Sequence, residues 1–222
     1  MLPDLPSYVN MVFLLTLVFT VWLLWKASQS LVVIAIAFVW IATTGILARR
    51  GFFEDTSGMP PHLALAVLPM LLLIVLVLIM GRRFIDALNL RVLTILSIVR
   101  IPVELCLYWL FLHKYVPQLM TFAGRNFDIL AGITAPIMYF ACFKGNTITR
   151  KGLLATWNIL CLVLLFNIVV IAALSAPFRF QQFAFEQPNI AVLYVPYVWL
   201  PCIIVPAVLF THLVMIVRLL RK

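Results

Sequence analysis

Charged residues are scarce in this chain of 222 residues: they make up 10% of it, whereas hydrophobic residues make up 65%. A mean hydropathy of +1.17 lies far outside the range of soluble domains. The length accommodates about seven membrane spans of roughly 20 residues and leaves no stretch for a separate soluble domain. The sequence therefore predicts an all-α, polytopic integral membrane helical bundle, with residues 1–222 as a single transmembrane domain.

The apolar runs also lack the alternation of polar and apolar residues that membrane β-strands need, which excludes a β-barrel. No Lys or Arg precedes the first run, so it is not a signal peptide and we expect it to be a retained helix. The expected spans are about 8–25, 31–48, 61–80, 91–115, 128–143, 152–174 and 193–217. Such a protein belongs in a membrane, which is the cytoplasmic membrane if the source is bacterial.

Cysteine is rare too, with four residues that all fall inside expected spans and form no C-x-x-C pair. This pattern excludes a disulfide framework and a zinc site, and we predict no metal. No lysine lies within a span, so a retinal Schiff base is excluded. Haem is not expected either, because His62 and His113 lie near outer span ends and offer His212 no partner at its depth. We predict no cofactor.

The net charge of +9 is carried by basic residues at span ends. One set of connections holds ten of them and the opposite set holds five. The richer set is Lys26, Arg82, Arg83, Arg91, Lys144, Arg150, Lys151, Arg218, Arg221 and Lys222. Because cytoplasmic loops retain more Lys and Arg, we expect the N-terminus outside and the C-terminus in the cytoplasm. A basic patch that could follow phosphates is lacking, so nucleic acid is not an expected partner.

The fourth run places Arg100, Pro102 and Glu104 in the middle of a membrane-length segment. Arg100 and Glu104 are four residues apart, so they share a helix face with Tyr108, which must point into the bundle. An ion pair between the two side chains would lower the free-energy cost of burying them. The order Arg then Glu gives the weaker i,i+4 pair, which leaves room for partners on other helices. Pro102 leaves the carbonyl of Ile98 without its donor and favours a kink.

Two polar residues of other spans, Asn158 and His212, lie at a depth in the membrane similar to that of Arg100. At about 1.5 Å per residue from the cytoplasmic span ends, Arg100, Asn158 and His212 lie within one layer, roughly 8 to 13 Å deep. Glu104 lies deeper. The candidate ligand-binding residues are Arg100, Glu104, Tyr108, Asn158 and His212, between the fourth, sixth and seventh spans. The alternative for Arg100 and Glu104 is a structural ion pair that only fixes helix register.

The polar run before the fifth span has two interpretations. Asp128 is suited to cap the next helix. Alternatively, Arg125, Asn126 and Asp128 form a binding edge at the outer surface. The connection 177–189 alternates phenylalanines with polar residues, which is typical of a segment lying in the membrane interface, or of a lid over an outer cavity. Prolines 196, 201 and 206 predict a disturbed last helix.

Three functions stay open. The first is a multi-pass membrane protein that binds or transports a small molecule at this polar site. The second is a non-catalytic subunit or scaffold of a larger membrane complex. The third is a membrane-embedded enzyme acting on a lipid or quinone-like substrate, which the lack of a Ser/His pair, H-E-x-x-H or paired carboxylates disfavours. The expected partners are the lipid bilayer and either a small-molecule ligand or other membrane subunits.

Overall fold

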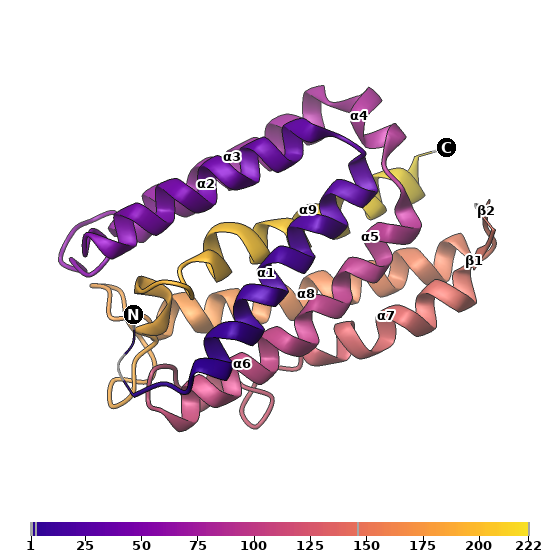
Figure 1. The fold of residues 1–222 in the computed structure, drawn as a ribbon. Coiled ribbons are helices and arrows are strands. Elements are labelled where there is room, and N and C mark those ends of the chain that lie inside the picture. The colour runs from indigo at the N-terminus through magenta and orange to yellow at the C-terminus, as the bar shows by residue number, and fades with distance from the viewer. Residues whose placement is uncertain (1, 3, 146, 222) are drawn as a thin grey trace.

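The computed structural model describes residues 2, 4–145 and 147–221, and these fold into a helical bundle (Figure 1). Its longer elements are α1 (Ser7–Ser28), α2 (Leu31–Arg49), α3 (His62–Met80), α5 (Leu90–Leu96), α6 (Arg100–Leu112), α7 (Ile129–Cys142), α8 (Lys151–Ser175) and α9 (Val205–Leu220). The shorter ones are α4 (Arg82–Ala87), β1 (Phe143–Lys144) and β2 (Thr147–Ile148), the last two forming an antiparallel hairpin. The predicted all-α membrane bundle is therefore confirmed.

Six helical segments in the described part of the chain are long and apolar enough to cross a membrane. They run over Ser7–Ser28, Leu31–Arg49, His62–Met80, Leu90–Leu112, Lys151–Ser175 and Leu200–Leu220. The fifth expected span is shorter, because α7 has 14 residues and reaches only about 21 Å against a hydrocarbon core of about 30 Å. The last span begins at Leu200 rather than at 193, after the region of Pro196. It opens with a π turn, Leu200–Ile204, before α9.

The fourth span is a helix with a defect at the expected place. A 3-10 turn at Ser97–Val99 separates α5 from α6. Pro102 lies one turn further on and has no N–H to offer the carbonyl of Ile98, so the regular ladder is interrupted there. The disturbance predicted from Pro102 is present as this local change of helix type.

The connection between α6 and α7, residues 113–128 and here called the dipping segment, turns some of its side chains into the bundle and leaves others exposed. Val116 and Met120 are fully buried, and the backbone carbonyl of Tyr115 accepts hydrogen bonds from the amides of Ile190 and Ala191, 3.1 Å each. α7 then starts beside Arg100, which lies roughly 18 Å along the helix from Leu112 at 1.5 Å per residue. Non-helical backbone is tolerated at membrane depth where protein buries it, and the residues that reach Arg100 and Glu104, Asn126 and Asp128, are buried.

Figure 1 places the N- and C-termini at opposite ends of the bundle, with α4 and the β1–β2 hairpin at the C-terminal end. Most of the richer basic set lies at that end, except for Lys222, which is outside the described residues. Arg218 donates to the carbonyls of Ile85 (3.2 Å) and Leu88 (2.9 Å), so it fastens α4 to α9. Which end faces the cytoplasm stays a prediction from charge.

The core runs along α1, α5, α6, α8 and α9, whereas α2 and α3 lie at one side of the bundle (Figure 1). Both carry many exposed apolar side chains, such as Val32, Phe38, Leu72 and Ile79. In a membrane protein such a surface faces lipid. The α2–α3 hairpin is thus held by one face only.

Candidate functional site

Arg100 is the centre of a buried polar cluster that joins four helices. Its Nη1 lies 2.7 Å from Oδ1 of Asp128, the residue that precedes α7. Its Nη2 lies 3.0 Å from Nε2 of His212 on α9. Both Nη atoms also approach the carbonyl oxygen of Cys161 on α8, at 3.4 and 3.5 Å. The guanidinium therefore ties α6 to α7, α8 and α9.

The orientation of the His212 ring follows from its neighbours. Its Nδ1 lies 2.7 Å from Oδ1 of Asn158, while the amide nitrogen of Asn158 donates to the carbonyl of Leu154 at 2.7 Å. Since Asn158 offers an oxygen to Nδ1, the ring proton sits on Nδ1 and Nε2 accepts from Arg100. His212 and Asn158 are fully buried, and both ring nitrogens are engaged. The structure thus brings Arg100, Asn158 and His212 together in one layer.

Glu104 does not pair with Arg100, contrary to the simplest expectation from their spacing. Its Oε1 accepts a short hydrogen bond from the side-chain amide of Asn126, which also donates to the carbonyl of Met120 at 3.0 Å. The Asn126 oxygen in turn accepts from the backbone amide of Asp128, at 3.0 Å. The dipping segment therefore supplies a partner to each charged residue of α6, and the intramembrane ion pair is Arg100 with Asp128.

The expected outer-edge group is divided by this arrangement. Asn126 and Asp128 are 0% and 6% exposed and belong to the interior cluster, so they do not form an outer edge. Arg125 is exposed, and its carbonyl accepts from the side chain of Asn167 at 3.0 Å. Asp128 does precede α7, as expected for a cap, but its side chain makes no capping hydrogen bond and serves Arg100 instead.

Tyr108 lies on the same helix as Glu104, one turn nearer the C-terminal end of α6. Its ring stacks on Phe122, with centroids 4.9 Å apart and planes 27° apart. It is half-buried and packs against the dipping segment. The structure therefore places Tyr108 beside this segment, away from the Arg100 and His212 layer.

A cavity of about 330 Å³ has Glu104 and Asp128 among its lining residues. Its other walls are almost wholly apolar and come from α3, α6, α8 and the segment before α9. Leu68 on α3 and Val169 on α8 belong to its lining and are exposed, so its mouth opens to lipid between these helices. The volume lies within the usual range of small-molecule pockets.

Three of the lining residues carry hydrogen-bond acceptors in their side chains: Glu104, Asp128 and Asn189. Oε2 of Glu104 and Oδ1 of Asn189 are buried and have no hydrogen-bond partner within the described part of the chain. Asn189 also donates to the carbonyl of Ala172, at 3.2 Å. Nothing in the sequence around Asn189 marks it as a site residue, because its position depends on how the connection 177–189 folds back over α8.

That connection contributes to the cavity wall. Phe178 is buried and Phe180 is partly buried, and both line the cavity, whereas Phe183 and Phe185 are exposed. The four rings therefore split between the two expected roles. Phe178 and Phe180 contribute to the cavity wall, whereas Phe183 and Phe185 are exposed.

The buried polar cluster around Arg100 carries a net negative charge when both Glu104 and Asp128 are ionised. Arg100 compensates one of the two carboxylates, Asp128, and His212 is a neutral acceptor in this network. Glu104 receives a neutral amide instead of a cation. A buried charge without a counter-charge is costly, so a proton or a cationic group beside Glu104 would stabilise the site.

Comparison of the chain with protein families, curated proteins and solved structures gives no match.

Proposed function

We propose that this multi-pass membrane protein binds a small amphipathic molecule in the cavity beside Glu104. The ligand has an apolar body and a cationic, hydrogen-bond-donating head group such as an amine. The observation that carries this proposal is that Glu104, one of the lining residues of an otherwise apolar cavity, has a buried Oε2 with no partner among the described residues. Such a combination matches an apolar molecule with one polar end.

The head group is inferred from the chemistry of the wall. Glu104 and Asn189 present unpaired oxygen atoms, which accept hydrogen bonds and attract positive charge. A carboxylate or phosphate head group would instead meet like charge. The apolar walls formed by Leu107, Leu165 and Ile168 suit a hydrocarbon body, and the mouth between α3 and α8 lets such a body enter from the bilayer.

Transport is the second part of this proposal. Helices that are interrupted at membrane depth are how many carriers build their solute sites. Here the 3-10 turn before α6 and the deep start of α7 both lie beside the Arg100 cluster. Two interrupted elements at one site give the protein a place where a small rearrangement changes access.

The test uses three probes with the same chain, dodecylamine, dodecanol and dodecanoate, and the purified protein in phosphatidylcholine nanodiscs. We expect the amine to bind best and dodecanoate worst. Glu104→Gln removes the negative charge and should weaken amine binding by about 10- to 100-fold, since a charge-assisted hydrogen bond contributes about 1.5–3 kcal/mol. Native mass spectrometry and equilibrium dialysis measure both quantities.

Glu186→Gln is the matched control, because Glu186 is exposed and undergoes the same chemical change. It should bind the amine as the unmodified protein does. Equal affinity for amine and carboxylate, or an unchanged affinity of the Glu104→Gln variant, would refute the proposal. Uptake of the amine into proteoliposomes then separates transport from binding alone.

A further inference from the structure

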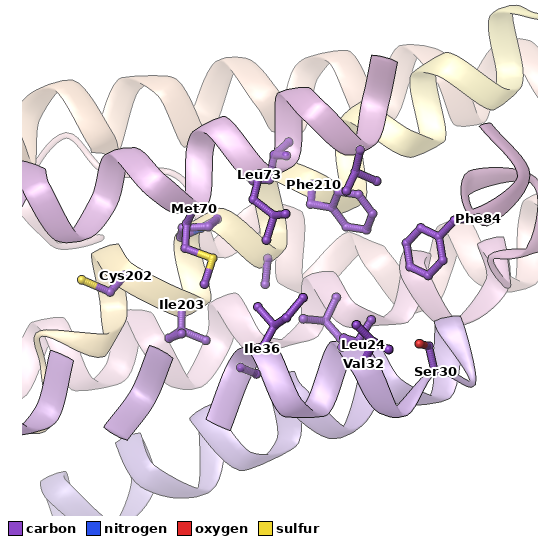
Figure 2. A pocket seen from close by; sticks show the side chains of 16 residues that line it. Leu24, Ser30, Val32, Ile36, Met70, Leu73, Phe84, Cys202, Ile203 and Phe210 are labelled. Atoms are coloured by element: carbon purple, nitrogen blue, oxygen red, sulfur yellow. The ribbon is translucent and has the colours of Figure 1, made fainter. Parts of the chain in front are cut away.

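A second cavity, of about 420 Å³, lies on the other side of α3 (Figure 2). Its walls come from α2, α3 and α9, with Ile36, Met70, Leu73, Ile203 and Phe210 among them. The lining is apolar except at one end, where Figure 2 shows Ser30 and Phe84 close to each other. This cavity is distinct from the one beside Glu104, and it belongs to neither the Arg100 cluster nor the proposed function.

Apolar cavities do not hold water well, and a cavity that opens beside a lipid-facing hairpin is instead filled by hydrocarbon. Val32 and Ile36 of its lining are 64% and 38% exposed, so the space is continuous with the surroundings of the bundle. A single acyl chain entering from the bilayer fits this geometry. The walls alone do not select the head group.

The head group is selected by charge at the polar end. Phe84 lines the cavity from α4, and the same short helix begins with Arg82 and Arg83, both exposed. These arginines have no acidic partner among the described residues. Arg82 and Arg83 directly precede Phe84, and Ser30 lines the same end of this acyl-sized cavity. Two cations and a hydroxyl near that end are complementary to a phosphate.

We propose that this cavity binds one acyl chain of an anionic phospholipid, whose phosphate lies between Ser30 and the Arg82–Arg83 pair. The lipid fills the space behind the α2–α3 hairpin, where α2 and α3 are otherwise supported on one face only. Phosphatidylcholine has the same chain but no net negative charge, so it binds less well.

The experiment reconstitutes the full chain in phosphatidylcholine vesicles that contain a minor fraction of phosphatidylglycerol carrying a photoreactive diazirine in one acyl chain. Mass spectrometry maps the cross-links, which we expect in the segments 70–77 and 203–210. Phosphatidylcholine with the same diazirine chain should label these segments much less. Arg82→Gln/Arg83→Gln should lower phosphatidylglycerol labelling by about 30-fold, because each basic residue near a membrane surface contributes about 1 kcal/mol.

Arg49→Gln/Arg50→Gln is the matched control, because this adjacent pair is exposed at the opposite end of α2. It should leave the labelling unchanged. A second variant, Ala37→Leu, places a larger side chain in the cavity wall and should reduce labelling by either lipid. Equal labelling by the two lipids, or full labelling of the Arg82→Gln/Arg83→Gln variant, would contradict the head-group assignment. Cross-links confined to residues that do not line the cavity would contradict the site.

Discussion

Arg100 receives a carboxylate, an imidazole nitrogen and a backbone carbonyl from three different helices or their ends. Such a residue is expensive to bury, at about 2.5–3.5 kcal/mol on insertion scales for the centre of a span. The cost is offset only while the set of partners is complete, so each partner depends on the others. The cluster therefore acts as one unit. Removing Arg100 or Asp128 alone leaves the other charge buried without its partner, whereas removing both does not.

This dependence leads to a double-mutant prediction. Arg100→Met and Asp128→Leu should each destabilise the protein by about 3–5 kcal/mol, because each leaves an uncompensated buried charge. The double variant should lose clearly less than the sum, since neither Arg100 nor Asp128 is left buried without the other. Unfolding in denaturing detergent measures the three free energies. Additive losses would show that Arg100 and Asp128 do not act as a pair.

At the scale of elements, the segment between α6 and α7 is the unusual part of the fold. It brings Asn126 to Glu104 and Asp128 to Arg100 by folding back on itself within a few residues. Gly124 makes this return possible, because a Cβ atom at that position would lie 2.1 Å from the carbonyl oxygen of Gln118. That neighbour is backbone and cannot rotate away.

We therefore expect Gly124→Ala to destabilise the protein by about 1–3 kcal/mol, the usual cost of forcing extra atoms into a packed site. Thermal unfolding in detergent measures the loss. Gly152→Ala is the control, because a Cβ at Gly152 in the first turn of α8 meets nothing within 4 Å. This control should be neutral or slightly stabilising, since alanine favours helix. Similar melting of the two variants would show that the return does not need glycine.

The same segment marks how far the sequence alone predicts this structure. Long apolar runs identify the six membrane-length helices, and Pro102 identifies the defect in the fourth. The spacing of Arg100 and Glu104 predicts a shared face but not their partners, because Asn126 and Asp128 resemble ordinary turn and capping residues in a loop.

One signal does point to the true arrangement: the fifth apolar run is short for a span, so its polar beginning lies deep. The position of Asn189 depends on tertiary folding and has no local signal.

At the scale of the whole molecule, the two cavities lie on either side of α3 and toward opposite ends. Pro61, Phe178 and Asn189 line the cavity beside Glu104, near the end that holds the N-terminus, whereas Ser30 and Phe84 line the other, near the C-terminal end (Figure 1). The orientation in the membrane therefore decides which leaflet supplies each ligand. With the C-terminus in the cytoplasm, the anionic lipid comes from the cytoplasmic leaflet, where anionic head groups and basic loops attract each other.

Cysteine labelling in intact cells tests this orientation, because Cys106, Cys142, Cys161 and Cys202 are buried and give little background. A membrane-impermeant maleimide should label Glu186→Cys, which is exposed at the N-terminal end, before permeabilisation. It should label Ala87→Cys, which is exposed on α4, only after permeabilisation. The reason is the excess of Lys and Arg at the α4 end, which stays on the cytoplasmic side during insertion. The opposite labelling pattern would show that the C-terminus lies outside and that the proposed phosphate site faces the outer leaflet. The same experiment therefore determines which leaflet supplies the ligand of each cavity.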